Sequence, residues 1–186
     1  KLGKGLAEMH LKSNEYNPKK FGYPLEGYIG LNNQPSGWEM NWIDCFANLR
    51  IKHQLKSFKN NSLNSDIKKN LISKIKLVLS KHIPIISLVH GDLWSGNVGI
   101  NKSNKGVIFD PACWWADSEV DIAMSYLFGG FQREFYREYF KAIPKQKGFE
   151  ERIIIYNLYH VLNHANMFGG SYVRQSNEYI KLIMNM

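Results

Sequence analysis

Hydrophobic side chains recur every three or four positions along most of this chain, a spacing that predicts helices with one face toward a core. We expect seven helices, over residues 2–14, 42–53, 67–78, 120–128, 135–143, 149–168 and 172–186. Ser62 and Ser65 are candidate N-caps of the third helix, because a serine hydroxyl accepts hydrogen bonds from free backbone amides. Paired glycines at 129–130 and 169–170 are expected to end two others.

A strand and a hairpin are expected in the middle of the chain. Residues 85–89 form an apolar run of strand length, and the apolar runs 98–100 and 107–109 flank the polar segment 101–106. Residues 17–37 are rich in Pro, Gly and Asn and have no hydrophobic period, which predicts a long ordered loop. The predicted fold class is α+β, mostly helical, with one small β-hairpin.

The sequence HGDLWSGN, residues 90–97, lies between this strand and the hairpin, and Asp110 follows the hairpin. This spacing is that of the protein-kinase catalytic loop, in which an Asp accepts the proton of the substrate hydroxyl while an Asn and a later Asp hold Mg²⁺. Asp92, Asn97 and Asp110 fill these three positions. The alternative, that each Asp only forms a turn, explains single residues but not their joint spacing.

Composition restricts the class of protein. The chain has 186 residues, of which 44% are hydrophobic and 13% aromatic, so it is long enough for one globular domain. It has no apolar run that spans a membrane and does not begin with the apolar segment of a signal peptide, so we expect a cytoplasmic protein without a membrane partner. Cys45 and Cys113 are too few for a disulfide framework and are expected to be free thiols.

The formal net charge is +8, which attracts anionic partners such as nucleotides. The lysines are scattered between apolar helix positions and no nucleic-acid-binding motif is present, so nucleic acid is not an expected partner. His160 and His164 lie four residues apart, a spacing at which a helix can hold zinc, but no third ligand is spaced nearby. We expect these histidines to make core hydrogen bonds instead.

Further motifs surround the catalytic loop and together cover most of the chain. They are LAEMH at 6–10, FGYP at 21–24, YIG at 28–30, QPSGW at 34–38, DPA at 110–112, EVDIAM at 119–124, LFGGF at 127–131 and the stretch from NH at 163–164 to FGG at 168–170. With these segments the chain resembles the fructosamine kinase family, also called ketosamine-3-kinases, which is related to aminoglycoside and choline phosphotransferases. The resemblance implies a protein-kinase-like fold. It also implies phosphorylation, dependent on ATP and Mg²⁺, of the 3-hydroxyl of free or protein-bound ketosamines, an activity in protein deglycation.

The resemblance also implies roles for residues around the catalytic loop. Asp92 would be the catalytic base, and Asn97 and Asp110 would be the magnesium ligands through which the nucleotide is bound. Trp94 would form a wall against the sugar, whose C–H surface suits an aromatic face. Core packing is the alternative role for this tryptophan.

Three other polar residues receive roles from the resemblance. His90 would orient the catalytic loop, and Asp121 resembles the carboxylate that holds this loop in related phosphotransferases. Glu119 is a candidate substrate contact. The alternative for both acids is a place in the first turn of a helix, where a negative charge is favourable.

The chain departs from the family pattern in two ways. Residues 114–118 (WWADS) replace a tyrosine-bearing aromatic pair, a glycine and a basic residue, so a related kinase of the choline or aminoglycoside type is the alternative. The resemblance also begins at the family's middle, without a glycine-rich nucleotide loop or a phosphate-binding lysine. We therefore expect residues 1–186 to form a kinase-like C-terminal lobe that is catalytically silent when isolated. The sequence makes no prediction of oligomeric state.

Overall fold

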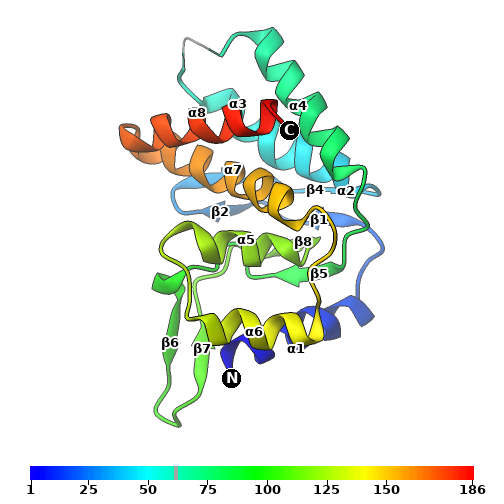
Figure 1. The fold of residues 1–186 in the computed structure, drawn as a ribbon, viewed down its shortest axis with the longest axis vertical. Coiled ribbons are helices and arrows are strands. Elements are labelled where there is room, and N and C mark those ends of the chain that lie inside the picture. Colours follow the sequence, from blue (N-terminus) through cyan, green and yellow to red (C-terminus); the bar gives the residue numbers. More distant parts are fainter. Residues whose placement is uncertain (61–62) are drawn as a thin grey trace.

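The computed structural model describes residues 1–60 and 63–186, and Figure 1 shows its helices on either side of a small sheet. The helices are α1 (Leu2–Glu15), α2 (Trp42–Asp44), the π-helix η1 (Cys45–Lys52), α3 (His53–Ser57), α4 (Ser65–Leu79), the 3-10 turn η2 (Ser95–Asn97), α5 (Glu119–Leu127), α6 (Arg133–Ala142), α7 (Phe149–Phe168) and α8 (Ser171–Met184). The strands are β1 (Phe21–Tyr23), β2 (Gly27–Ile29), β3 (Asn32–Gln34), β4 (Gly37–Glu39), β5 (Ile86–Val89), β6 (Val98–Ile100), β7 (Gly106–Ile108) and β8 (Trp114–Asp117). The α+β, mostly helical class predicted from the sequence is confirmed.

All seven predicted helices are present, and two of them differ in detail. The segment expected as one helix over residues 42–53 is helical but consists of α2, η1 and α3 in succession. The N-cap of α4 is Asn64 rather than Ser65, because the Asn64 Oδ1 accepts the backbone N–H groups of Asp66 and Ile67 at 3.1 and 2.9 Å. The other candidate cap, Ser62, lies outside the described residues.

The prediction of a long loop over residues 17–37 is wrong. Four antiparallel strands form the main sheet in the order β4-β1-β8-β5, and β2 pairs with β3 in a hairpin of its own. The strands that the sequence did not reveal have three or four residues each, too few for a recognisable alternation. Their partners are also remote in sequence, since Gly22 pairs with Trp115 and Leu88 pairs with the same residue. The β6–β7 hairpin is present where it was expected.

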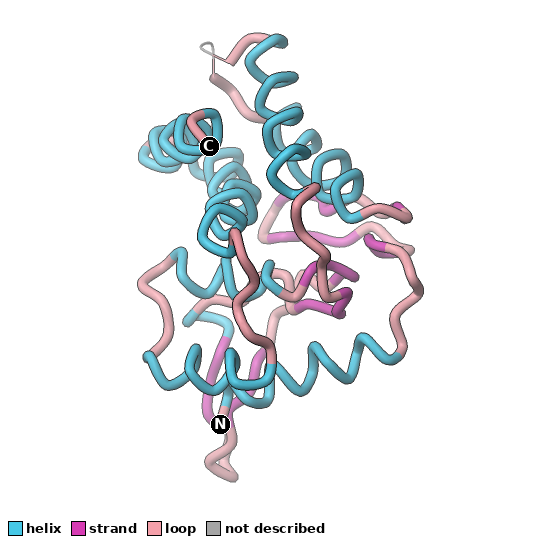
Figure 2. The backbone as a smooth tube through the Cα atoms, turned by 45° about the vertical axis from the view of Figure 1, so that its right-hand side comes forward, coloured by secondary structure: helices cyan, strands magenta, loops and turns pink. Residues whose placement is uncertain are grey.

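Two hydrophobic clusters lie on the two sides of the main sheet. Helices α4, α7 and α8 cover one side and helices α1 and α6 the other, as Figures 1 and 2 show from two directions. The rings of Trp42 and Trp114 stack in the larger cluster with their centroids 5.6 Å apart. Leu93, which directly follows Asp92, is fully buried in the smaller cluster. The catalytic-loop segment is therefore fastened to the core.

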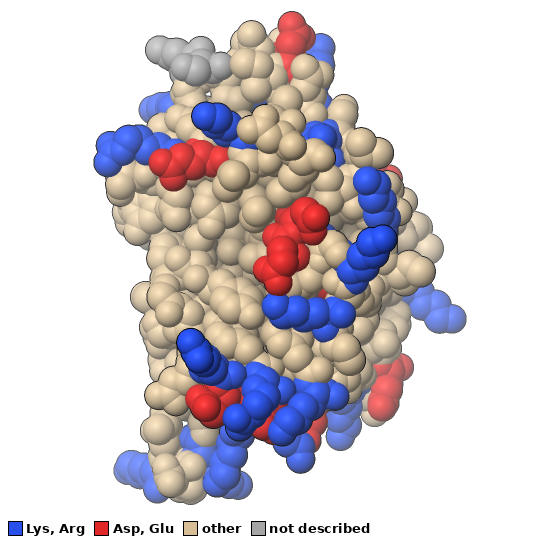
Figure 3. Space-filling model, viewed as in Figure 1, with Lys and Arg blue, Asp and Glu red and all other residues tan. Residues whose placement is uncertain are grey.

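The charged surface residues and the two cysteines are arranged as the sequence predicted. Figure 3 shows Lys and Arg spread over the visible face, and over α6 they alternate with acids, as in the Lys141–Glu138 pair at 2.7 Å. Cys45 is buried and Cys113 half-buried, and both are free thiols. Among the helices of the described ranges, none has the length and hydrophobicity needed to cross a bilayer.

Candidate active site

The HGDLWSGN segment runs from the end of β5 to the start of β6. The 3-10 turn η2 closes it, and Asn97 is the last residue of that turn. The Asn97 Nδ2 donates to the backbone oxygen of Asp92 at 2.8 Å and to the Asp92 Oδ2 at 3.1 Å. These two bonds hold the carboxylate and the amide side by side.

The β6–β7 hairpin returns the chain to this loop. The backbone N–H of Phe109 donates to the Asn97 carbonyl at 3.1 Å, and that of Ala112 donates to the His90 carbonyl at 2.9 Å. Asp110 lies between these two bonds with a φ of +56°, a left-handed conformation that Asp adopts more readily than most residues. The structure therefore brings Asp110 beside Asn97 and Asp92.

Two side chains with oxygen atoms suited to a metal lie on these neighbouring segments. The amide nitrogen of Asn97 donates to Asp92, which leaves the amide oxygen as the atom of this side chain that could bind a metal. The Asp110 carboxylate is exposed to solvent on the neighbouring turn. An amide oxygen and a carboxylate are donors of the kind that Mg²⁺ takes. The residues present therefore fit a magnesium ion.

The Asp92 carboxylate is half-buried, and its surroundings act on its charge in opposite directions. Burial raises the pKa of Asp92, and the nearby charge of Asp110 adds to this effect. The hydrogen bond from Asn97 lowers the same pKa, and the nearby His164 imidazole acts in the same direction. The site thus holds two carboxylates within electrostatic range of each other and two imidazoles beside one of them.

Asp121, in α5, binds the backbone of the HGDLWSGN segment. Its Oδ2 accepts the N–H of His90 and its Oδ1 the N–H of Gly91, both at 2.8 Å. Gly91 has a φ of +81°, and a Cβ atom there would collide with the backbone oxygen of Ala112. Although burial alone would raise the pKa of Asp121, the hydrogen bonds that it accepts lower it. An ionised, fully buried carboxylate therefore fixes the loop at a position that requires glycine.

His90 connects the two halves of the loop through its ring. Its Nε2 donates to the Phe109 carbonyl at 2.8 Å, and its Nδ1 lies 3.3 Å from the backbone N–H of Asp92. Both contacts are made at once by the neutral tautomer that carries the proton on Nε2. The ring thus joins the segment before Asp92 to the turn that carries Asp110.

His10, which is fully buried in α1, has a role that was not predicted from the sequence. Its Nε2 donates to the Asp121 Oδ2 at 3.1 Å, and its Nδ1 lies 2.8 Å from the Tyr139 hydroxyl. His10 and Asp121 are 111 residues apart. No local sequence pattern predicts a contact between residues so far apart, and the helical pattern around His10 predicts only that it is buried.

An aromatic surface lies beside Asp92. Trp94 is 37% exposed and meets Phe128 edge to face at 5.9 Å. The His164 ring packs against Phe128 at 4.9 Å, Tyr172 at 5.1 Å and Phe168 at 5.8 Å. Each Phe-Gly-Gly repeat ends a helix, as expected, and also places its phenylalanine against His164. From the sequence, these segments were expected only to end helices, so their contact with His164 was not predicted.

The structure places Glu119 away from Asp92. Both carboxylate oxygens of Glu119 bind Arg152, at 2.6 and 2.8 Å. Asp117 pairs with Ile86 at the beginning of β5, whereas Asp92 follows the end of that strand. Glu119 therefore lies toward the opposite end of β5, and its surroundings give no support to the expectation of a substrate contact.

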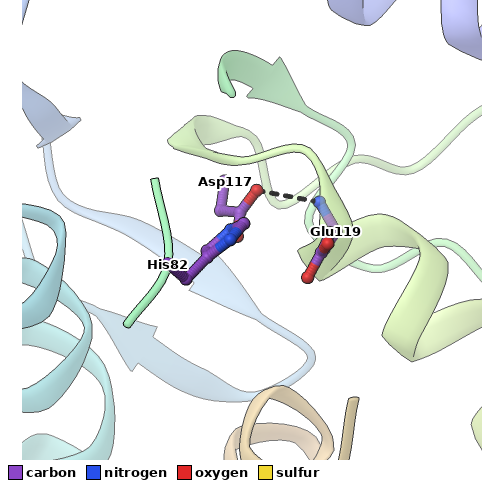
Figure 4. A group of neighbouring side chains, drawn as sticks. All are labelled: His82, Asp117 and Glu119. Carbon is purple, nitrogen blue, oxygen red and sulfur yellow. Dashed lines mark hydrogen bonds and ion pairs between the residues drawn. The ribbon is translucent and has the colours of Figure 1, made fainter. Parts of the chain in front are cut away.

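Glu119 belongs to a buried polar group with His82 and Asp117, shown in Figure 4. Their ligand-type atoms lie within 4.8 Å of one another, and within the described ranges this is the one such group of three. The Asp117 Oδ2, however, already accepts from the Tyr156 hydroxyl and lies 2.7 Å from the His82 Nε2. With Arg152 on Glu119, both acids have protein partners, so we interpret the group as a structural network.

Glu119→Ala is expected to lower the free energy of unfolding by about 3 kcal/mol, because it leaves the buried Arg152 without a counter-charge. Urea denaturation of the 186-residue chain measures this change. Glu138→Ala, which removes an acid from surface pairs on α6, is the matched control and should cost far less. Equal stability of the two variants would contradict a structural role for Glu119.

Comparisons with known proteins agree along the whole chain. The family model for fructosamine kinase matches residues 1–186. A Vibrio parahaemolyticus protein described as a ketoamine kinase is 43% identical over 100% of this chain and 63% of its own length. The chloroplastic protein-ribulosamine 3-kinase of Arabidopsis thaliana is 40% identical over 92% of this chain and 52% of its own. The chain thus spans less than two thirds of the length of these relatives.

A solved structure from Haemophilus somnus, described as a fructosamine-3-kinase, superposes with a TM-score of 0.85 and 32% identity. It covers 97% of this chain, which in turn covers 61% of it. A second such structure, from Thermobifida fusca, gives a TM-score of 0.83 at 25% identity. The fold around the loop is therefore the protein-kinase-like fold of these proteins. The family model and the shared fold together show that the chain belongs to the fructosamine kinase family.

Proposed function

We propose that this chain carries the base, the metal ligands and the acceptor wall of a kinase that transfers phosphate from ATP to the 3-hydroxyl of a ketosamine. The observation that carries the proposal is the pairing of Asp92 with Asn97 beside Asp110, on a loop fixed from both ends. Phosphoryl transfer needs an oriented hydroxyl, an acceptor for its proton and a held metal.

In this mechanism Asp92 accepts the proton of the sugar hydroxyl as the oxygen attacks phosphorus. The hydrogen bond from Asn97 to the Asp92 Oδ2 fixes the carboxylate, and the bond to the backbone oxygen fixes the residue that carries it. Asn97 and Asp110 would hold Mg²⁺, which when bound supplies positive charge that offsets the charge of the transferred phosphate. Asp121 and His90 maintain the positions of these groups through the backbone.

Trp94 and its neighbours would form one wall of the acceptor site. A sugar presents C–H groups on one face, and an aromatic ring offers them a complementary surface. The partial exposure of Trp94 supports this role over pure core packing. The names of the relatives, ketoamine kinase and ribulosamine 3-kinase, are consistent with an acceptor of this class.

In this proposal, residues 1–186 make up the C-terminal lobe. The nucleotide phosphates would be bound mainly by residues outside this lobe. The sequence contains no glycine-rich nucleotide loop, and the relatives are longer than this chain. Because positioning and charge neutralisation provide most of the rate in phosphoryl transfer, residues 1–186 alone would transfer little phosphate.

The intact protein is expected to transfer phosphate from ATP to fructose-lysine or ribose-lysine, with choline and an aminoglycoside as poor acceptors. ADP release measures turnover, and ³¹P NMR of the product identifies the 3-phosphate. The 186-residue chain, assayed in parallel, should show negligible transfer. Efficient transfer to choline or an aminoglycoside, with none to either ketosamine, would contradict the proposal.

The sequence departure at residues 114–118 motivated the choline-type or aminoglycoside-type alternative. Those residues form β8 and the turn after it, where Trp114 and Ala116 are fully buried in the core. A change in a buried strand alters core packing more directly than substrate choice. The departure therefore gives the alternative little support.

A further inference from the structure

The β2–β3 hairpin carries three large hydrophobic side chains that lie mostly in solvent. Leu25, two residues before β2, is 68% exposed, Tyr28 is 70% exposed and Leu31 is 83% exposed. A single exposed hydrophobic residue needs no explanation, but several on one short element mark an interaction surface. With Glu26, which lies between the first two, we call these residues the hairpin surface.

The hairpin is held against the candidate active site by specific bonds. The Asn32 Nδ2 donates to the Asn163 Oδ1 at 2.7 Å, and the Leu31 N–H lies 3.3 Å from the Met167 sulfur. Asn163 directly precedes His164 of the aromatic surface. Figure 1 shows β2 beside α7, in agreement with these bonds.

The same hairpin is fastened to the turn that follows Asp110. The Gln34 Nε2 donates to the Ala112 carbonyl at 3.0 Å, and the Tyr159 hydroxyl supports the Gln34 side chain at the same distance. The exposed side chains thus stand on a support that is fixed relative to the catalytic groups.

A cleft of about 120 Å³ separates the hairpin from the segment after Asp110. Tyr23, Glu26 and Tyr28 line it on one side, and Pro111 and Cys113 on the other. Its size suits one amino-acid side chain rather than a nucleotide. Its walls combine aromatic rings with one carboxylate, a combination suited to an apolar or cationic side chain.

Charge also favours a ketosamine, free or protein-bound, at this place. The chain as a whole has a net charge of +8, yet the hairpin surface contains an acid, Glu26, and no lysine or arginine. The nitrogen that joins sugar and lysine in a ketosamine is a secondary amine and is protonated at neutral pH. A substrate that extends from Asp92 toward the hairpin therefore brings a positive charge toward Glu26.

Resting on the function proposed above, we propose that the hairpin surface binds the polypeptide part of a protein-bound ketosamine. The hydrophobic side chains contact residues that flank the glycated lysine, and the cleft takes one of them. The site at Asp92 then recognises the sugar, and the hairpin distinguishes a glycated protein from a free glycated amino acid.

The test compares two acceptors on the intact protein, free fructose-lysine and a peptide in which a glycated lysine is flanked by hydrophobic residues. The triple variant Leu25→Ser, Tyr28→Ser, Leu31→Ser should lower kcat/KM for the peptide by about tenfold or more, since contacts with three apolar side chains are lost. Its kcat/KM for free fructose-lysine should stay unchanged. Ile83→Ser, at a loop residue that is 84% exposed, is the matched control and should affect neither acceptor.

Each other outcome overturns the proposal. An equal loss on both acceptors would mean that the hairpin only supports the catalytic groups, and no loss on the peptide would mean that it does not bind polypeptide. Light scattering adds a further check, because conversion of a dimer to a monomer in the triple variant would assign the surface to self-association. If the unchanged protein phosphorylated neither acceptor, the proposed function would fail and this inference with it.

Discussion

Asp92→Asn in the intact protein is expected to lower kcat for ketosamine phosphorylation by about three orders of magnitude, while the fold is retained. A general base contributes roughly 10²- to 10⁴-fold to such a rate, and an amide cannot accept the proton of the sugar hydroxyl. The change keeps the size of the side chain, and the Asn97 amide can still donate to the backbone oxygen of residue 92. We therefore expect KM to change much less than kcat.

Steady-state kinetics with fructose-lysine measure the effect, and circular dichroism with thermal unfolding verifies the fold. Asp66→Asn is the matched control, since Asp66 is an exposed acid in the first turn of α4, and it should leave kcat unchanged. Asp92→Asn turnover within tenfold of the unchanged protein would remove Asp92 as the base.

Asp121→Ala is expected to lower the free energy of unfolding by about 3–5 kcal/mol, the range found when one partner of a buried charged network is removed. The substitution leaves the His90 and Gly91 amides and the His10 ring without their acceptor in a fully buried place. Urea denaturation of the 186-residue chain measures this loss without any kinase assay. Amide hydrogen exchange at Gly91 should become faster as the loop is released.

The contribution of Asp121 should also depend on pH. Its pKa in the folded chain lies below the value of about 3.9 that an unperturbed Asp has. A carboxyl group whose pKa is lower in the folded chain than in the unfolded chain stabilises the fold. This stabilisation is fully present at a pH above the pKa of the unfolded chain, and it is lost as the pH falls through the pKa of the folded chain. The stability difference between the unchanged chain and Asp121→Asn should therefore be constant from pH 5 to 7 and shrink below about pH 4. A difference that grew in acid would contradict the ionised state.

Features that depend on residues close in sequence were predicted, and those that depend on remote residues were not. Asp92 and Asn97 are five positions apart, so their spacing placed them in one candidate site, where the structure shows them in contact. The helices were predicted because each has its own hydrophobic stripe. Strands β1 and β8 were not predicted, because each is short and pairs with strands that are remote in sequence. For Glu119, a motif suggested a substrate contact, whereas the structure pairs it with Arg152, 33 residues away, a partner that no local pattern indicates.

By itself, the sequence determined the helices, the hairpin and the spacing of the catalytic loop, because these depend on neighbours within a few residues. The resemblance assigned Asp121 to holding that loop, but only the tertiary structure decided what holds Asp121, since the ring of His10 binds its carboxylate from α1. It also decided which surfaces adjoin the site, by bringing the β2–β3 hairpin against α7 across 131 residues. Such contacts form because burial of the two hydrophobic clusters brings remote segments together, and no local pattern encodes them.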